Sequence, residues 1–539
     1  MKFSLSHLTW KDVIRFYVFP VLAALGHRIG FSWQTLGRSF LGRFVLFAQA
    51  KHITKSMKPI KADKVLDIYF LSMLGSHTHN ISVDVVLALG LIQKGHSVTM
   101  VLDDMCLPIN EDKKNGQESR WEEITARGYL FGSKYFDAAG LRFINLSSII
   151  DKNVSVDTTA FEPILEASIL KHYKVGVVSE TLPLLSQKKE LIKQSLNYST
   201  QLGHYILSKH PDRVIMSHGI YATWGPPFEI LDKHGIPVVT YSKTKRKKTE
   251  KFNWNYTGDW WDVSKEWEIV KHKSLTIEQE EKIDQYLKSR ITHEEDVLVY
   301  NFGAKESKQK TFERFNLDSN LPVYALFTNV LWDAASAQRE IVFKNPINWV
   351  FETIDYFIDK PHLQLLVKIH PAEVVIGTNQ PFARLIYERF PNLPANIKII
   401  EPQEEVNSWS IYEITTMGMV HTTTAGMELP LVGVPCAVVS RTHYRNMGFT
   451  IDVNSKEEYF NLFSSNALDN VDSEQIMTLS KRYAYLLFER YQMPFDVFDE
   501  VAWTDVRSLK FDNMEALFQI PYYERIIDAI INKEEFLTA

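Results

Sequence analysis

Histidine and threonine side chains gather in two short motifs in the second half of the sequence. The motif KIHPAE carries His370 at the end of the apolar run LQLLVKI, and HTTTAGMEL carries the successive hydroxyls of Thr422, Thr423 and Thr424. The ring N–H of a histidine can donate a hydrogen bond to phosphate. Hydroxyls and free backbone N–H groups at the start of a helix also bind anions, because the helix dipole is positive there. The two motifs together predict a phosphate-binding site.

Residues beside these motifs extend the predicted site. Gly426 would let the backbone approach a ligand closely, and Glu428, one turn into the predicted helix, could accept hydrogen bonds from sugar hydroxyls. Lys368, Glu373 and Tyr444 are polar neighbours of the same motifs, and we assign them to the same site. The alternatives are an ordinary His-Pro turn and a threonine N-cap that binds no ligand.

Three histidines in the first half of the chain are candidates for a general base. His77 and His79 stand in GSHTHN after the first strongly apolar run, and His218 stands in SHGIYATW after another. Imidazole titrates near neutral pH, so each ring could take a proton from a hydroxyl group. We prefer His79 to His77. The alternative is that these histidines have no catalytic role.

The segment 243–267 joins the basic run KTKRKKTEK to the aromatic run FNWNYTGDWW, and we interpret it as a long loop. Aromatic rings stack on sugars, and ammonium groups attract phosphate. Trp254, Trp260, Lys247 and Lys248 are therefore predicted to bind an acceptor. A solvated loop is the alternative, and nucleic acid is disfavoured because the chain is acidic overall, with a net charge of −5.

The elements that must position these residues follow from the apolar runs. VLDIYFLSML (65–74) and VYALFTNV (323–330) are continuous, which is typical of strands buried on both faces of a parallel sheet. Strand–helix–strand units are predicted over 65–102 and 213–241, and a second α/β series starts at 322. The sequence thus predicts an α/β protein with two doubly wound, Rossmann-like domains facing across a cleft, where such proteins bind ligands.

The first 62 residues contain ten basic residues and one acidic residue. Trp33, Phe40 and Phe44 recur there at helical spacing, with Arg38 and Arg43 between them. This pattern predicts an amphipathic helix that lies in the interface of an anionic membrane. The apolar run 16–25 is shorter than the roughly 20 residues that cross a bilayer. Packing of this helix on the next domain is the alternative.

Several classes of protein lose support from what the sequence lacks. Cys106 and Cys436 are the two cysteines, and they form neither a disulfide framework nor a zinc motif, which suits a reducing compartment. The motifs GxGxxG after the first strand, GxxxxGK[ST], GxSxG and HExxH are all missing. Nicotinamide dehydrogenases, P-loop enzymes, serine hydrolases and zinc proteases are therefore disfavoured, and no metal or cofactor is predicted.

KIHPAE, HTTTAGMELPLVGVPCAVV and RTHYRNMGFTID, preceded by NVLWDAA, follow in this order within about residues 320 to 455. In this region the chain resembles bacterial capsule polysaccharide biosynthesis glycosyltransferases of the GT-B type, which have two Rossmann-like domains and include Kdo transferases. The resemblance implies a CMP-activated donor, with His370 and Thr422, Thr423 and Thr424 holding its phosphate. The acidic-acidic-Gly base motif of the similar bacterial sialyltransferases is missing from the first domain.

By this resemblance the protein is a metal-independent glycosyltransferase on the cytoplasmic, inner face of the cell membrane. It would move Kdo or a related acid from a nucleotide sugar onto a capsular or surface polysaccharide or its lipid-linked precursor. The nucleotide sugar is a co-substrate, and no cofactor is needed. Three alternatives are a transferase that uses a UDP-sugar, a nucleotide-sugar epimerase, and a non-catalytic scaffold for capsule assembly.

The predicted domain boundaries follow these roles. They are a basic amphipathic membrane-associating segment (1–62), a Rossmann-like acceptor domain with linker (63–300), a Rossmann-like donor domain (301–472) and a group of C-terminal helices (473–539).

Overall fold

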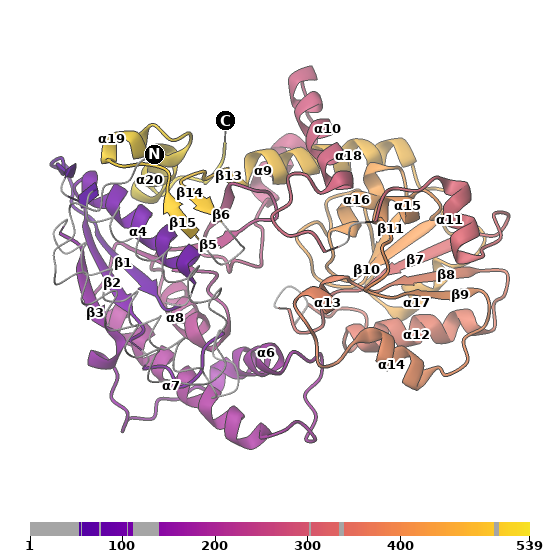
Figure 1. Ribbon diagram of the computed structural model, residues 1–539, viewed down its shortest axis with the longest axis horizontal. Helices are drawn as coiled ribbons and strands as arrows, with labels where there is room; N and C mark the ends of the chain where they lie inside the picture. Colours follow the sequence, from indigo (N-terminus) through magenta and orange to yellow (C-terminus); the bar gives the residue numbers. More distant parts are fainter. Residues whose placement is uncertain are drawn as a thin grey trace. The chain divides into compact units, whose positions relative to one another are not determined.

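The computed structural model describes residues 53–54, 56–74, 77–104, 106–111, 140–300, 303–333, 339–500 and 506–538. They form two compact units, each built on its own α/β sheet (Figure 1). The predicted fold class, α/β with two doubly wound, Rossmann-like sheets, is confirmed. The amphipathic helix predicted around Trp33 to Phe44 lies outside the described residues.

The first unit contains a seven-stranded sheet in the order β13-β6-β5-β4-β1-β2-β3. The parallel strands are β1 (Asp67–Ser72), β2 (Ser97–Leu102), β3 (Arg142–Asn145), β4 (Arg213–Ser217) and β5 (Val238–Lys243). Antiparallel strands β6 (Thr249–Trp254) and β13 (Met493–Pro494) extend one edge.

Helices cover both faces of this first sheet. Those described are α4 (Thr78–Gln93), α6 (Glu162–Tyr173), α7 (Leu185–Ser208), α8 (Tyr221–Lys233), α19 (Met514–Phe518) and α20 (Tyr523–Asn532). Ile68 and Phe70 of β1 pack in one hydrophobic cluster with α4 and α20, whereas Tyr69 and Leu71 pack in another with α7 and α8. Successive side chains of a strand point to opposite faces, so the unbroken apolar run of β1 reflects a core on each side.

The first half of the segment expected to be a long loop is in fact part of a β-hairpin, and the segment ends in a helix from Ser264. β5 and β6 pair from Val239 with Trp254 to Lys243 with Glu250, and the basic run supplies the turn between them. Lys248 takes a left-handed backbone conformation in this turn, with φ of 61°. The composition hid the strand, because its buried stretch includes the charged residues Glu250 and Lys251.

The second unit contains a six-stranded parallel sheet in the order β12-β11-β10-β7-β8-β9. Its strands are β7 (Val323–Phe327), β8 (Gln364–Lys368), β9 (Ile397–Ile400), β10 (Met417–Val420), β11 (Cys436–Val438) and β12 (Ile451–Asp452). The helices are α9 (Ser264–Val270), α10 (Ile277–Thr292), α11 (Lys308–Phe315), α12 (Pro346–Ile358), α13 (Ala372–Val375), α14 (Phe382–Arg389), α15 (Ser408–Tyr412), α16 (Ala425–Leu431), α17 (Lys456–Asn461) and α18 (Ser473–Tyr485).

The division of the chain differs from the predicted one at 300/301 and 472/473. The first unit comprises the described residues up to His172, together with Thr181–Gly258 and those from Tyr491 onward, and the second comprises Tyr173–Glu180 and Asp259–Arg490. The second of these boundaries differs because the final segment returns to the first unit. There Tyr523 packs against α4 and donates a hydrogen bond to the carbonyl oxygen of Val86 at 2.7 Å. A side chain at Gly90 would lie 2.3 Å from the Tyr523 hydroxyl, so glycine is required at that contact.

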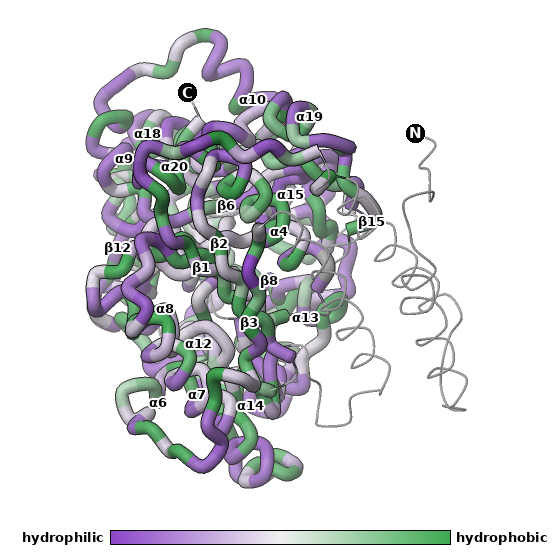
Figure 2. Tube along the Cα trace, turned by 90° about the vertical axis from the view of Figure 1, so that its left-hand side faces the viewer, coloured by the Kyte–Doolittle hydropathy of each residue, from purple (hydrophilic) through white to green (hydrophobic). Residues whose placement is uncertain are grey.

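The last part of the first unit contains a second, two-stranded sheet. A short antiparallel pair, β14 (Phe498–Glu500) and β15 (Val506–Leu509), precedes α19. Hydrophilic and hydrophobic stretches are interspersed along the described trace (Figure 2). Among the described helices, none combines the length and the apolar composition that crossing a membrane would take.

Candidate active site

Each sheet has one point where the order of its strands reverses. In the first sheet the chain builds outward from β1 to β2 and β3 on one side and from β4 to β5 on the other. In the second sheet the corresponding pair is β7 and β10. In open α/β sheets, ligands bind just outside the carboxyl ends of the strands at this switch point. We therefore expect a ligand site at the loops after β1 and β4 in the first unit, and at the loops after β7 and β10 in the second.

At the second switch point an amide side chain bridges the two central strands. Asn329, after β7, donates from Nδ2 to Oγ1 of Thr422, after β10, at 2.9 Å. The backbone N–H of Thr422 donates in return to Oδ1 of Asn329 at 3.2 Å. This two-bond bridge fixes the position of the first predicted threonine at the carboxyl edge of the sheet.

His370 follows β8, the neighbour of β7, and its ring orientation is set by the backbone. The N–H of Ala372 donates to Nδ1 of the ring at 3.1 Å, and the N–H of His370 itself donates to Oγ1 of Thr328 at 3.0 Å. Because Nδ1 accepts a hydrogen bond, a neutral ring carries its proton on Nε2. His370 therefore presents an N–H donor from the edge of the sheet, as a phosphate ligand requires.

The remaining residues of the threonine motif are held by Tyr444, which is fully buried. Its hydroxyl donates to the carbonyl oxygen of Thr423 at 2.7 Å. A side chain at Gly426 would lie 2.6 Å from the Tyr444 ring. Glycine is therefore needed here for the approach of a tyrosine, which differs from the predicted approach of a phosphate. Thr424 is the N-cap residue of α16, and its side chain does not cap the helix.

Three predicted ligand residues make contacts within the protein instead. The carboxylate of Glu428 accepts from Arg290 at 2.5 Å and from the Tyr412 hydroxyl at 2.7 Å. Lys368 donates to a backbone carbonyl oxygen, and burial lowers the pKa of its ammonium group to about 8. Glu373 accepts from the N–H that begins α14, and burial raises the pKa of its carboxyl group to about 7. Their contacts with a ligand stay predictions.

At the first switch point an amide–hydroxyl contact also bridges the central strands. Asn80, in the first turn of α4, donates from Nδ2 to Oγ of Ser217, at the end of β4, at 3.3 Å. His77 and His218 lie on the two loops that meet here, and both are half-buried. The ring of His218 lies 4.6 Å from that of Trp224 in an edge-to-face contact. Two of the three predicted general bases therefore lie beside the first switch point.

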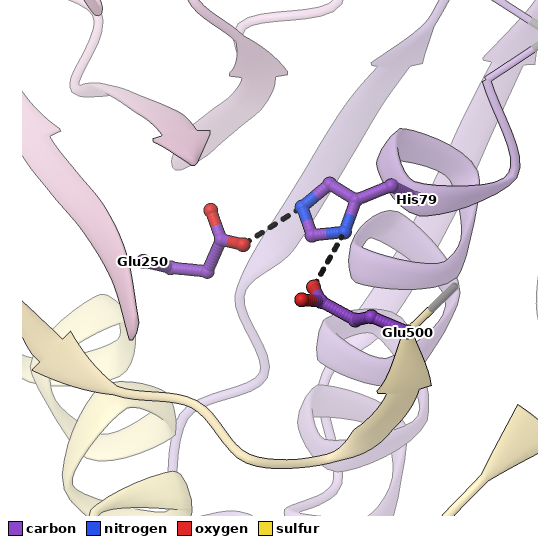
Figure 3. Close-up of side chains that lie close together, drawn as sticks. All are labelled: His79, Glu250 and Glu500. Carbon is purple, nitrogen blue, oxygen red and sulfur yellow. Dashed lines mark ion pairs between the residues drawn. The ribbon is translucent and has the colours of Figure 1, made fainter. Parts of the chain in front are cut away.

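His79, the preferred base, occupies a different environment (Figure 3). Its ring lies between two carboxylates, with Nε2 at 2.7 Å from Oε1 of Glu250 and Nδ1 at 3.4 Å from Oε1 of Glu500. Lys243 completes the cluster, with Nζ at 2.5 Å from the same Glu500 oxygen. His79 and Glu250 are buried, and the ring nitrogens meet the carboxylates without a well-directed hydrogen bond.

This cluster determines what His79 can do. Burial by itself lowers the pKa of the His79 ring, but the charge and contacts of Glu250 and Glu500 outweigh it, so that the pKa is raised. Both ring nitrogens face carboxylates and the ring is buried, so neither nitrogen is placed to take a proton from a bound hydroxyl group. In this conformation His79 is therefore less suited to act as a base than His77 or His218, which reverses our preference.

Among the described residues, His79, Glu250 and Glu500 form the one group of side chains that could hold a metal ion. The two carboxylates face different nitrogens of the ring, whereas a single metal ion takes one nitrogen from a histidine. Lys243 already places a positive charge on Glu500. A protonated imidazole and an ammonium group thus balance the two carboxylates, and this donor set is a poor fit for a metal ion.

The predicted acceptor residues divide between the two units. In the first unit Trp254 lies beneath the C-terminal segment, where its Nε1 donates to the carbonyl oxygen of Glu534 at 2.7 Å. Lys247 and Lys248 are exposed in the hairpin turn, and Lys248 pairs with Asp496 at 3.3 Å. Trp260 belongs to the second unit, where the guanidinium of Arg339 lies 4.8 Å from the centre of its ring. The role of these four residues in binding an acceptor stays a prediction.

Sequence reasoning missed the roles of Asn80, Ser217 and Arg339. Each of the first two ends or follows a predicted strand, so a search for polar side chains at every strand end would have found them. Arg339 lies 12 residues after the end of β7, and no local pattern marks it.

No protein-family model and no curated protein matches the chain. It is similar to solved structures of sugar-nucleotide enzymes, including two of KpsC from Thermosulfurimonas dismutans. The β-Kdo 2,4 transferase is 14% identical at a TM-score of 0.34, covering 51% of this chain and 79% of that one. The β-Kdo 2,7 transferase is 10% identical at 0.32, covering 62% and 90%. UDP-GlcNAc 2-epimerase from Neisseria meningitidis, bound to UDP-GlcNAc, is 11% identical at 0.23, covering 79% and 100%.

These neighbours include Kdo transferases and an epimerase. Similarity at such scores does not decide between the two reactions.

Proposed function

We propose that the protein is a nucleotide-sugar-dependent glycosyltransferase whose second unit binds the sugar donor at its switch point. The observation that carries the proposal is the orientation of His370. Its Nδ1 accepts a backbone hydrogen bond, so a neutral ring carries its proton on Nε2, just after β8, the strand beside β7 of the Asn329–Thr422 bridge. On transfer, the bond between the sugar and the phosphate oxygen breaks and the nucleotide leaves, so a fixed donor at this place would stabilise the charge that develops on the phosphate of the leaving nucleotide.

The hydroxyl groups of Thr422, Thr423 and Thr424 would provide further donors to the same phosphate. Neutral donors of this kind take the role that a metal ion has in other transferases, so we propose metal-independent catalysis. Glu428 and Tyr444 would act indirectly. Glu428 holds α16 through the Tyr412 hydroxyl, and Tyr444 holds the threonine loop through the carbonyl oxygen of Thr423.

The first unit would bind the acceptor at its own switch point. His77 or His218 would take the proton from the attacking hydroxyl group, because both are half-buried and lie on the loops that meet there. His79 would act indirectly, as part of the buried ion cluster beside α4.

The finer assignment follows the resemblance of the motifs around His370 and Thr422 to capsule glycosyltransferases. We propose Kdo or a related acid from a CMP donor as the transferred sugar, and a capsular or surface polysaccharide or its lipid-linked precursor as the acceptor. The basic first 62 residues suit an anionic membrane surface, so the protein would act at the inner face of the cell membrane.

The experiment that tests the proposal is a thermal-shift panel of the protein against CMP, CDP, UDP, GDP and ADP. A ligand that binds the native state raises its melting temperature by mass action. We expect selective stabilisation by CMP, and we expect His370→Ala to abolish it. His362→Ala is the matched control, since His362 is exposed in the same unit and lies before β8.

The other outcomes separate the alternatives. Stabilisation by UDP would keep the transferase and change its donor. Conversion of a nucleotide sugar in the absence of any acceptor would indicate an epimerase. No response to any nucleotide would overturn the proposal in favour of a scaffold, and an unchanged response in His370→Ala would remove His370 from the site.

A further inference from the structure

Arg339 is a cation of the second unit that is held in place on two sides. Its guanidinium forms an ion pair with Asp259 and lies 4.8 Å from the centre of the Trp260 ring. The side chain of Arg339 is 19% exposed, and that of Asp259 is 10% exposed. A planar guanidinium stacked on an indole loses little further freedom when it binds a ligand.

The backbone places Arg339 at the same edge of the sheet as the threonine motif. The N–H of Arg441 donates to the carbonyl oxygen of Arg339 at 2.7 Å, and Glu340 forms a bridge with Ser440. Ser440 in turn donates from its hydroxyl to the carbonyl oxygen of His421 at 2.6 Å. His421 directly precedes Thr422, so a short series of hydrogen bonds connects Arg339 to the predicted phosphate site.

Arg339 brings a positive charge to this edge of the sheet, whereas the buried ring of His421 does not. Burial, together with the neighbouring Arg339, lowers the pKa of the His421 ring to about 3, so that ring is neutral at physiological pH. The guanidinium has five N–H donors. Within the described part of the chain, its one side-chain hydrogen bond is the one from Nη2 to Asp259. A guanidinium can bind an anion through its other N–H groups while it keeps this bond.

We propose that Arg339 binds a second anionic group of the sugar nucleotide, in addition to the phosphate held by His370. Two sources share this chemistry. One is the carboxylate of an acidic sugar linked through a single phosphate, and the other is the second phosphate of a nucleoside diphosphate sugar. Both fit the bidentate geometry of a guanidinium. The inference rests on the proposed function, since it assigns the donor class at the same site.

The test measures dissociation constants by calorimetry for three ligands that share one base: CMP, CDP and CMP-Kdo. Arg339→Gln should leave CMP affinity unchanged, because CMP lacks the second group. A selective loss for CMP-Kdo of about ten- to a hundredfold, the range typical of charge-assisted bonds, would identify the carboxylate. The same selective loss for CDP would identify the second phosphate. Arg339→Lys, which keeps the charge and loses the fork, should give a smaller loss.

Controls separate binding from indirect effects. Arg384→Gln removes an arginine of the same unit that is 72% exposed and pairs with Glu388, and it should change none of the three affinities. Arg339→Gln also uncovers Asp259, whose negative charge could repel the ligand. The double variant Asp259→Asn with Arg339→Gln removes that charge. If the double variant regains wild-type affinity for CMP-Kdo and CDP, the guanidinium only masks Asp259 and the inference is wrong.

Two further outcomes would overturn the inference and leave the proposed function intact. They are an equal loss for all three ligands, and no loss for any of them, while wild-type CMP binding still depends on His370. If the wild-type protein binds no nucleotide at all, the proposed function fails, and the assignment of Arg339 falls with it. The melting temperature of each variant without ligand shows whether the second unit has folded.

Discussion

The switch points of the two sheets have the same asparagine bridge but different side chains beside it. In each, an asparagine after the first central strand donates to a hydroxyl of the other, Asn80 to Ser217 and Asn329 to Thr422. Behind the first lies a buried cluster of charges around His79. Beside the second lies His370, a half-buried ring whose donor is fixed by a backbone N–H. The same order of the central parallel strands therefore supports a buried charge cluster in one unit and a half-buried, oriented donor in the other.

This difference indicates which of the two units is suited to bind an anion. Fixed N–H and O–H donors stabilise a phosphate group without any change of protonation. The second switch point supplies them. Behind the first switch point the carboxylates are paired with His79 and Lys243, which leaves no excess positive charge for a phosphate, so that region suits a neutral sugar hydroxyl and a proton acceptor.

The largest effect we expect tests whether Glu428 is a ligand residue or a structural one. Glu428→Ala leaves the buried guanidinium of Arg290 with Asp296 as its remaining carboxylate partner. Removing one partner of a buried ion pair costs about 3–5 kcal/mol. Denaturant unfolding should show this loss, and hydrogen exchange should place it in α10 and α16. A variant of normal stability that has lost nucleotide binding would instead give Glu428 a role in the ligand site.

A smaller loss is expected from adding a methyl group at Gly426. The new Cβ would lie 2.6 Å from the ring of Tyr444, and overpacking of this kind costs about 1–3 kcal/mol. The measurement is a double-mutant cycle, in which Tyr444→Ala is combined with Gly426→Ala. The cost of the methyl group should be smaller in the Tyr444→Ala background. An equal cost in both backgrounds would show that the ring is not what requires glycine here.

The two buried histidines should give opposite pH dependences. The pKa of His79 is raised, so its contribution to stability is present below the unfolded value of about 6.5 and is lost as pH rises through its folded-state pKa. The pKa of His421 is lowered to about 3, so the folded state loses stability as pH falls from about 6.5 toward that value.

Melting temperatures of the wild type, His79→Asn and His421→Asn test the contrast. They are measured below a pH of about 6.5 for His421 and above it for His79. The advantage of the wild type over His79→Asn should shrink as the pH is raised. Its advantage over His421→Asn should shrink as the pH is lowered, by about 2–4 °C for each kcal/mol in a unit of this size. Parallel curves for the wild type and His79→Asn would mean that His79 does not hold a proton between its carboxylates.

Much of this arrangement could be predicted from local sequence, and some of it could not. The strands β1 and β7 were evident from their apolar runs, and His370 and Thr422 were evident because they follow strands. The hairpin strand β6 was missed because a buried Glu250 and Lys251 look like loop residues until their partners are known. The charged environment of His79 depends on Glu500, which is 421 residues away in the sequence and is brought close by the return of the chain. Spacing along the sequence does not contain that information.

The smallest expected effect compares the two asparagine bridges directly. A single hydrogen bond contributes about 0.5–1.5 kcal/mol, so Asn329→Ala should weaken nucleotide binding by roughly two- to twelvefold by releasing Thr422. Asn80→Ala removes the equivalent bridge in the first unit and should leave nucleotide affinity unchanged, while it lowers the rate of transfer at subsaturating acceptor. Calorimetry with CMP and a transfer assay with varied acceptor measure the two effects. If Asn80→Ala weakened CMP binding as much as Asn329→Ala, the division of donor and acceptor between the two switch points would be wrong.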